Sequence, residues 1–327
     1  MTMLAESRKP AVAAALTGYA IDSLLYESRQ SRIYRGQRLV DAVPVILKVL
    51  SDDFPSPEKR ARFQQEYDLM RKLASDGVLR AYDMEFRHGI QVMVLEDFGG
   101  TSLNNLDIHA NLSIDAWLKL AVRVAECLNQ LHQHHIMHKD INPANVVWNR
   151  KSGEIKLIDL GIATELTREV PEVRNPDRLE GTLSYISPEQ TGRMNRAIDY
   201  RTDFYSLGVM FYEMLSGQLP FVSGDALELV HAHIARVPAP IEQLRPGIPP
   251  MISAIIAKLM GKTAEERYQS ATGLQADLQT CLDTVSESGV IAPFPLGRHD
   301  FSGRLQISQK LYGRESQIAT LLEVFDR

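Results

Sequence analysis

The rhythm of apolar and polar positions changes near residue 100 of this 327-residue chain. Residues 19–50 carry three segments with a strand-like pattern, separated by polar turns, and residues 78–98 return to that pattern. Between them, the spacing of apolar residues predicts a helix over about 57–74. The first hundred residues therefore predict a small, strand-rich region that contains one helix.

The remainder of the chain favours helices. Ser113 is placed to cap a long helix, and Gly217 is placed to end the helix "DFYSLGVMFYEMLS". Two short strands, "NVVW" and "IKLIDL", are expected between them, and helical patterns dominate from about residue 202. A larger, mostly helical region is thus expected to follow the small one. The predicted apolar face of the first long helix consists of Leu118, Val122, Ala125, Leu128 and Leu131.

The composition is that of a globular protein, with 44% hydrophobic and 24% charged residues. A formal net charge of -5 gives no electrostatic reason to expect binding to nucleic acid. Cys127 and Cys281 lie far apart with no CxxC motif, so neither a disulfide framework nor a zinc site is expected. No apolar run approaches the roughly 20 residues that a membrane-spanning helix needs. We therefore expect a soluble, cytoplasmic protein with reduced thiols.

Two charged side chains fall in apolar surroundings. Lys48 lies inside the strand-like segment "VILKVL", and Glu66 shares the apolar face of the following helix with Phe63, Met70 and Leu73. Because removing one partner of a buried ion pair costs roughly 3–5 kcal/mol, the two charges are expected to meet each other if both are buried. A lysine that extends along a strand edge into solvent is the alternative.

Polar groups also gather in one short loop. Residues 136–148 read "IMHKDINPANVVW", which places His138, Asp140 and Asn145 close together, and Asp159 follows the apolar segment "IKLI". Buried acids are costly unless something positive meets them. The pattern therefore predicts a cation near these residues.

Three histidines precede this loop. His132, His134 and His135 are expected at the end of the long helix, where imidazoles suit the negative end of the helix dipole. A metal site built from them is the disfavoured alternative.

Taken together, these motifs resemble the eukaryotic-type protein kinases. "VILK", a glutamate eighteen residues later, "HKDINPAN", "DLG", "GTLSYISPE" and "DFYSLG" occur in the order and spacing of that family, over roughly residues 19–285. "ERYQSA", which contains Arg267, is similar to a late kinase motif whose arginine pairs with the glutamate of the SPE-type motif, here Glu189. The resemblance implies an α+β, two-lobed kinase fold, with an antiparallel-sheet N-lobe over 19–98 and a mostly helical C-lobe over 99–285.

The resemblance also implies ATP and Mg²⁺ as cofactors, and it assigns roles to the polar residues. Asp159 and Asn145 would bind the metal, and Asp140 would orient the acceptor hydroxyl and receive its proton. Lys48, fixed by Glu66, would bind the α- and β-phosphates. The metal and the phosphates would then balance each other's charge, so that no acid is left without a partner.

By the same resemblance, "LEDFGG" is the hinge between the lobes. Leu95 would be the gatekeeper, and the backbones of Glu96 and Phe98 would bind adenine. Ile46 replaces a usual alanine and is expected to narrow the adenine pocket. The remaining nucleotide-binding residues that the resemblance implies are Ile33 and Val147.

Other residues would support the site. Thr182 lies where serine/threonine kinases place a threonine that contacts the catalytic aspartate, which implies Ser/Thr hydroxyls of a protein as acceptors. His138 matches the packing histidine of the family. Asp203 would brace the catalytic loop from a buried helix, and an ordinary N-cap or first-turn role is the alternative. Candidate phosphorylation sites, among which the sequence does not choose, are Thr164, Thr167, Thr182 and Ser184.

The sequence departs from the family in the phosphate loop. Tyr26, Ser28 and Ser31 stand where the family has the glycines of G-x-G-x-x-G, and side chains there are expected to keep the backbone farther from the phosphates. Arg29 and Arg32 could reach the phosphates instead. Exposed arginines are more often simply solvated, which is the favoured expectation.

The catalytic loop departs as well. Asn142 stands where these kinases have a lysine, which removes a positive charge from the transferring phosphate. Lys139 replaces the arginine of HRD and loses its bidentate geometry. Activity is nevertheless favoured, because four core groups remain: Lys48, Asp140, Asn145 and Asp159.

Three functions are open at this point. The favoured one is an active serine/threonine kinase that phosphorylates protein substrates as a signalling module. A nucleotide-binding pseudokinase that acts as an interaction module is the main alternative, motivated by the absent glycines and by Asn142. A small-molecule phosphotransferase of the aminoglycoside-kinase type shares an H-x-D-x-x-x-x-N loop. That group lacks the activation segment that "GTLSYISPE" and "DFYSLG" indicate.

The ends of the chain differ from the two lobes. Residues 1–18 are expected to form an N-terminal extension. Residues 286–327 predict a linker and the truncated start of an ATPase-like domain, because they resemble the junction in large bacterial kinase–ATPase–sensor proteins. Downstream ATPase and sensor domains of a longer chain are thus expected partners besides the protein substrate, whereas neither nucleic acid nor a membrane is expected.

Overall fold

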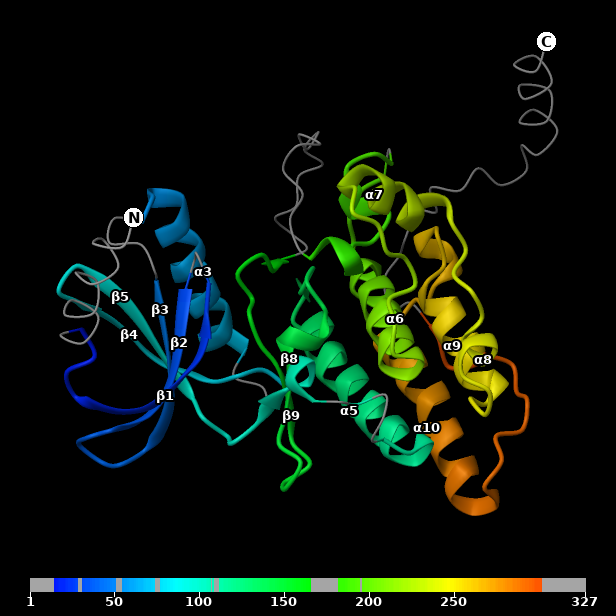
Figure 1. Cartoon of the computed structure of the whole chain (residues 1–327), viewed down its shortest axis with the longest axis horizontal. Coiled ribbons are helices and arrows are strands. Elements are labelled where there is room, and N and C mark those ends of the chain that lie inside the picture. Colours follow the sequence, from blue (N-terminus) through cyan, green and yellow to red (C-terminus); the bar gives the residue numbers. More distant parts are fainter. Residues whose placement is uncertain are drawn as a thin grey trace, which may run out of the picture.

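The computed structural model describes residues 15–28, 31–50, 55–73, 77–106, 108, 112–165, 182–194 and 196–301. They form two lobes, with a sheet at the left of Figure 1 and a bundle of helices at the right. The expected α+β, two-lobed architecture is confirmed. Among the helices of this described part, none has both the length and the apolar character needed to cross a bilayer.

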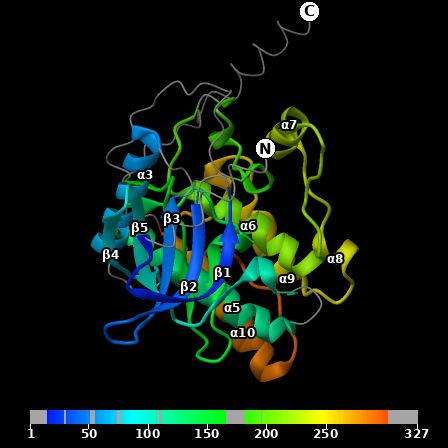
Figure 2. The same cartoon turned by 60° about the vertical axis from the view of Figure 1, so that its left-hand side comes forward.

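The N-lobe is an antiparallel sheet whose strands follow the order β1-β2-β3-β5-β4. Figure 2 shows β4 and β1 at opposite edges of this sheet. All five strands fall within the two segments of strand-like pattern. Their bounds are β1 (Tyr19–Glu27), β2 (Ser31–Arg38), β3 (Pro44–Leu50), β4 (Ala81–Arg87) and β5 (Ile90–Glu96).

Helix α3 (Pro57–Leu73) covers one face of the sheet and buries the apolar stripe expected for it. Successive side chains of a strand point to opposite faces of a sheet. In β3, Leu47 therefore packs on the outer face with Leu16, whereas Ile46 and Lys48 line a cavity between the lobes. The period of two in "VILKVL" thus turns the lysine away from the outer core.

The C-lobe is a helical bundle in which α5 (Ile114–Gln133) and α10 (Ala271–Ser288) lie side by side. Ser113 caps α5 through its side chain, as expected. Almost all of α6 (Arg201–Ser216) is buried, and the helix ends at Gly217, whose φ of 76° lies in the left-handed region that suits glycine. The remaining helices are α7 (Ala226–Ala235), α8 (Ile241–Leu244) and α9 (Pro250–Leu259).

Short strands fix two polar loops between the lobes. The loop that contains Asp140 runs from β7 to β8, and the loop that contains Asp159 runs from β9 to β10. Both loops are therefore anchored at each end by hydrogen-bonded strands. These strands are β6 (Thr101–Ser102), β8 (Val146–Trp148) and β9 (Ile155–Leu157), which form one sheet, and β7 (Ile136–Met137), which pairs with β10 (Thr164–Glu165).

The packed C-lobe continues past the boundary expected at residue 285. Helix α10 runs on to Ser288, and Ile291 is buried. The carboxylate of Asp300 accepts hydrogen bonds of 2.8 Å from the backbone N–H groups of Gln269 and Ser270, at the start of α10. The first part of the expected linker is therefore attached to the C-lobe, because its Asp300 binds the backbone just before α10, whose N-cap is Ser270. The start of the expected ATPase-like domain lies outside the described residues.

Candidate active site

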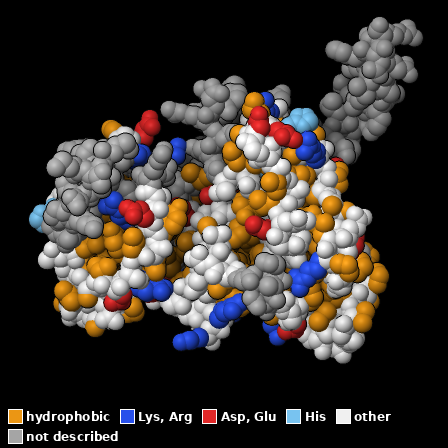
Figure 3. Space-filling view, viewed as in Figure 1, with side chains coloured by type: hydrophobic (Ala, Val, Ile, Leu, Met, Phe, Trp, Pro, Cys, Tyr) orange, Lys and Arg blue, Asp and Glu red, His pale blue; other side chains and the backbone are white. Residues whose placement is uncertain are grey.

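A cavity of about 320 Å³ lies between the lobes, where the surface in Figure 3 is hollowed. Its walls are apolar on both sides, with Ile33 and Ile46 from the N-lobe and Val147 from the C-lobe. Such a cavity suits a ligand with a flat apolar part and an anionic part, because charged groups also line it. The other expected nucleotide-binding residues that line it are Lys48, Glu66, Leu95, Glu96, Phe98, Asn145 and Asp159.

Lys48 is paired with two acids in this cavity. Its Nζ lies 2.7 and 2.9 Å from the carboxylate oxygens of Glu66, and 3.1 Å from Oδ1 of Asp159. The side chains of Lys48 and Glu66 are 11% and 3% exposed, so the alternative of a lysine that reaches into solvent is wrong. Burial alone would lower the pKa of Lys48, but the charges of Glu66 and Asp159 outweigh it and hold that pKa above its usual value. Lys48 is therefore a fixed cation.

Asp159 is an anion that faces the same cavity. The charge of Lys48 lowers the pKa of Asp159 and outweighs the opposite effect of burial. Its side chain is 48% exposed although it contacts Lys48, so part of the carboxylate is accessible from the cavity. The backbone of Asp159 has a φ of 65°, which is uncommon for a residue other than glycine.

Asn145 lies beside Asp159 and presents an oxygen ligand. Its Nδ2 donates to the backbone carbonyl of Asp140 at 2.9 Å and to Oδ2 of Asp140 at 3.1 Å, so its amide oxygen is the atom that it can offer to a cation. Mg²⁺ is usually bound by one or two protein groups together with phosphate oxygens and water. In the described ranges, no group of three or more His, Cys, Asp or Glu residues could hold a metal. Asp159 and Asn145 thus fit a metal that arrives with a phosphate ligand.

Asp140 is oriented from both sides at the edge of the cavity. Thr182 donates its backbone N–H to Oδ1 of Asp140 at 2.9 Å, while Asn145 donates to Oδ2. The backbone N–H of Asp140 points to Nδ1 of His138, and Nε2 of His138 donates to the carbonyl of Ile158 at 3.0 Å. An ionised carboxylate has roughly four acceptor positions, so Asp140 can still accept a hydroxyl proton.

Asp203 holds the start of this loop from the buried helix α6. It is 0% exposed, and its carboxylate accepts hydrogen bonds from the backbone N–H groups of His138 at 2.9 Å and Lys139 at 2.7 Å. Burial would raise the pKa of Asp203, but the hydrogen bond and charge of His132 lower it. The N-cap of α6 is Tyr200, so an N-cap role for Asp203 is wrong, whereas its place in the first turn of α6 is confirmed.

For His132, the sequence predicts only a position at the end of a helix. Its Nε2 lies 2.9 Å from Oδ2 of Asp203, and the residue is 8% exposed. The sequence carries no local signal for this pair, because the two residues are far apart along the chain.

Glu189 and Arg267 form a second buried ion pair, away from the cavity. Nη1 and Nη2 of Arg267 lie 2.6 and 2.8 Å from the two carboxylate oxygens of Glu189, and both side chains are buried. Burial would raise the pKa of Glu189, but Arg267 holds it below its usual value. The pair expected from "SPE" and "ERYQSA" is thus formed.

The turn between β1 and β2 makes contacts with itself. The N–H of Ser31 donates to Oγ of Ser28 at 3.1 Å, and the N–H of Ser28 donates to the carbonyl of Ser31 at 2.9 Å. Arg32 forms a 2.6 Å ion pair with Glu27, so it is not simply solvated as expected. Arg29 lies outside the described residues. The backbone donors of Ser28 and Ser31 are therefore engaged, whereas a glycine loop would offer such donors to phosphate.

Comparison with known protein families shows which kind of domain contains this cavity. The sequence model of the protein kinase domain matches residues 20–278. The chain belongs to the protein kinase domain family. Its two lobes are therefore those of the kinase fold, and the cavity between them is the nucleotide cleft of that fold.

Several of the curated relatives that this kinase domain matches are bacterial proteins. A probable serine/threonine-protein kinase, SCO3848 of Streptomyces coelicolor, is 28% identical over 272 residues, which are 81% of this chain and 40% of the relative. Serine/threonine-protein kinase PknB of Mycolicibacterium smegmatis is 28% identical over 270 residues, 80% of this chain and 41% of the relative. Hybrid signal transduction histidine kinase G of Dictyostelium discoideum is 37% identical over 166 residues, 45% of this chain and 5% of the relative. The chain spans about two fifths of the length of the first two relatives.

Two ion pairs that the sequence did not predict fix the hinge of the kinase domain. Arg35 of β2 holds Asp97 through contacts of 2.7 and 3.2 Å, and Lys156 of β9 holds Glu96 at 2.8 Å. Each pair joins residues sixty or more positions apart, so no local pattern signals it. Because one partner comes from the N-lobe and the other from the C-lobe, the hinge is tied to both lobes.

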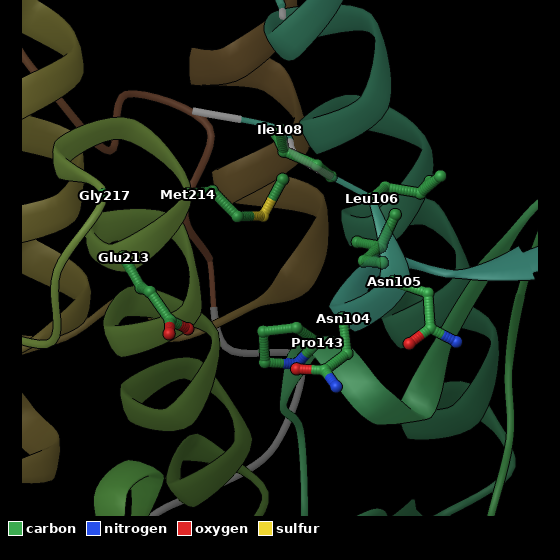
Figure 4. A pocket seen from close by; sticks show the side chains of 9 residues that line it. Asn104, Asn105, Leu106, Ile108, Pro143, Glu213, Met214 and Gly217 are labelled. Atoms are coloured by element: carbon green, nitrogen blue, oxygen red, sulfur yellow. The ribbon is translucent and has the colours of Figure 1, made fainter. Parts of the chain in front are cut away.

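A second hollow, of about 490 Å³, lies beside the catalytic loop of the kinase domain. Figure 4 shows Glu213 and Met214 of α6 on one side of it, Asn104 and Asn105 on the other, and Pro143 of the catalytic loop between them. Both asparagines also line the nucleotide cleft. The two hollows thus adjoin at these asparagines.

Proposed function

We propose that this kinase domain transfers the γ-phosphate of ATP to Ser or Thr hydroxyls of protein substrates, as a signalling module. The observation that carries the proposal is the arrangement of Lys48, Asn145 and Asp159 around one cavity, with Asp140 fixed at its edge. Lys48, held by Glu66, is positioned to bind the α- and β-phosphates. The names of the bacterial relatives favour serine and threonine as acceptors.

We propose that Asp159 and Asn145 hold Mg²⁺ through a carboxylate and an amide oxygen. When bound, the metal supplies positive charge that neutralises the phosphate oxygens. Asp140 orients the acceptor hydroxyl and accepts its proton at the carboxylate. The backbone N–H of Thr182 and the amide of Asn145 keep that carboxylate in one orientation, which lowers the entropic cost of reaching the reactive geometry.

The acceptor would bind across the second hollow beside Pro143, since this hollow adjoins the catalytic loop and the nucleotide cleft. A cytoplasmic location is proposed because ATP is the phosphate donor. Downstream ATPase and sensor domains of a longer chain remain proposed partners. Thr164, Thr182 and Ser184 remain candidate phosphorylation sites, and Thr167 lies outside the described residues.

A nucleotide-binding pseudokinase is the second candidate. Two observations favour it: the engaged donors of Ser28 and Ser31 in the phosphate loop, and Asn142 in place of a lysine. In that case Mg–ATP would bind and stabilise the protein without useful transfer.

Mass spectrometry after incubation with Mg–ATP and a generic protein acceptor tests the proposal. The wild type should incorporate phosphate, and Asp140→Ala should lower the rate by roughly 10²–10⁴-fold, because general-base catalysis by a positioned group contributes about that much. Thermal shift with Mg–ATP should remain positive in both proteins. Transfer by the wild type that does not exceed the Asp140→Ala background, together with a positive thermal shift, would support the pseudokinase instead.

A further inference from the structure

The side chain of Asn142 is hydrogen-bonded at both ends of its amide. The residue is 4% exposed, and its Oδ1 accepts the backbone N–H of Ala144 at 2.9 Å. Its Nδ2 donates to the backbone carbonyl of Asp140 at 3.1 Å and lies 3.4 Å from Oγ1 of Thr182. A single neutral amide thus contacts the catalytic loop in two places and also reaches Thr182 of the activation segment.

These contacts converge on Asp140. Its backbone carbonyl accepts both the amide of Asn142 and the amide of Asn145, at 3.1 and 2.9 Å. Its Oδ1 accepts the N–H of Thr182 at 2.9 Å. Since Asn142 contacts Thr182 as well, the three residues Asp140, Asn142 and Thr182 form a closed set in which each contacts the other two.

A lysine at position 142 could not reproduce this set. Lysine has three donors and no acceptor, so the N–H of Ala144 would lose the oxygen that caps the short helix Pro143–Asn145. The ammonium group is also a mobile point charge on a flexible stem, whereas the amide is planar and held by both its ends. The replacement of lysine by asparagine therefore exchanges a free charge for a fixed hydrogen-bonded link.

We propose that Asn142 is a positioning residue, which fixes the orientation of Asp140 and the seat of Thr182. The inference rests on the proposed phosphoryl transfer and deepens it. The charge of the reacting phosphate is then met by Lys48 and by the metal that Asn145 and Asp159 would hold. Asn142 itself carries no charge and acts by holding neighbouring groups in position.

The test compares Asn142→Ser, Asn142→Lys and the matched control Asn129→Ser, a partly buried asparagine on α5. Serine keeps an N-cap acceptor but cannot reach Asp140 and Thr182 as the amide does. Kinetics would give kcat and the KM for ATP, and hydrogen exchange would report peptides that span 138–146 and 182–190. Thermal shift with Mg–ATP checks that the nucleotide site is intact.

The inference predicts that Asn142→Ser lowers kcat about tenfold with little change in the KM for ATP, because one net hydrogen bond contributes about that factor. Exchange should rise in both peptides, and Asn142→Lys should behave in the same way. A second measurement uses Thr182→Ala, whose loss in kcat should not add to that of Asn142→Ser.

Unchanged exchange and kcat in Asn142→Ser would overturn the inference, and so would a kcat for Asn142→Lys at or above the wild-type value. Additive losses for Asn142→Ser and Thr182→Ala would also count against it. If the wild type itself shows no transfer but Asn142→Ser still raises exchange in both peptides, the proposed function fails and the positioning role stands.

Discussion

The two walls of the nucleotide cleft use their polar groups in different ways. The floor consists of Asn145 and Asp159, which line the cleft, and of Asp140, which is hydrogen-bonded to Asn145 beside it; all three lie on loops anchored by strands. The roof consists of four described residues at the β1–β2 turn, Glu27, Ser28, Ser31 and Arg32. Ser31 lines the cleft and is hydrogen-bonded to Ser28, while Arg32 forms an ion pair with Glu27. From this difference we expect that binding of a triphosphate depends on Lys48 and the floor, and much less on the roof.

The largest expected effect comes from breaking the buried Lys48–Glu66 ion pair between β3 and α3, which holds Lys48 over the floor. Glu66→Gln leaves Lys48 with Asp159 alone, and loss of one partner of a buried pair costs roughly 3–5 kcal/mol. Chemical denaturation should show a loss of stability of that order, and kcat/KM for ATP should fall at least tenfold. Asp68→Asn, an exposed carboxylate on the same helix, is the matched control and should change stability by less than about 0.5 kcal/mol. An equal loss of stability and of kcat/KM in the two variants would contradict the proposed dependence of ATP binding on Lys48.

The next effect is a loss of stability at low pH, which we expect in the C-lobe and not in the N-lobe. His233 of α7 is 0% exposed, and burial, followed by the charge of Lys262, lowers its pKa to about 4. Between that value and its ordinary pKa of 6.5 the unfolded chain binds a proton that the folded one does not, so stability falls as the pH is lowered through this window. The full loss is about 3 kcal/mol, by the conversion of 1.36 kcal/mol for each pH unit.

Tyr205, the hydrogen-bond partner of His233, lies on α6, the helix that also carries Asp203. Because Asp203 holds the loop of Asp140, protonation of His233 should destabilise the floor before it affects the roof. Hydrogen exchange at pH 7 and pH 5 should show increased exchange in α6 and α7, with little change in the N-lobe sheet. His233→Gln should reduce the pH dependence of stability, and the exposed His231→Gln on the same helix should leave it in place. A pH dependence that is the same in all three proteins would exclude His233 as its source.

The smallest effect is expected in the roof. Ser28→Gly with Ser31→Gly would let the backbone approach the phosphates, but each glycine costs roughly 0.5–1 kcal/mol of conformational entropy. The KM for ATP should therefore change by less than about threefold in steady-state kinetics. Ser152→Gly in the β8–β9 turn provides a matched serine outside the cleft. A decrease of tenfold or more in the KM would mean that the roof, and not the floor, limits binding.

Local pattern and family motifs predicted the parts of the site that have a sequence period or a fixed spacing. The strand period turned Lys48 towards the cleft, the stripe of α3 turned Glu66 towards it, and "HKDINPAN" placed Asp140 and Asn145 in one loop. Such features follow from alternation and spacing along a few residues.

The contacts that the sequence did not predict join residues that are far apart along the chain. His132 with Asp203, Arg35 with Asp97 and Lys156 with Glu96 depend on how the elements pack, so no local pattern carries them. The sequence also did not indicate that Ser28 and Ser31 bond to each other, or that Arg32 pairs with Glu27. Pairing of this kind is selected by tertiary geometry among many possible partners.

Whether the floor binds ATP through Mg²⁺ can be measured by calorimetric titration of ATP, with and without Mg²⁺, into the wild type and Asp159→Asn. We expect Mg²⁺ to tighten binding of ATP to the wild type by at least tenfold, and Asp159→Asn to lose most of this gain because the floor then lacks its anionic ligand. Equal affinity with Mg²⁺ and with a chelator, or a full magnesium effect in Asp159→Asn, would contradict this expectation.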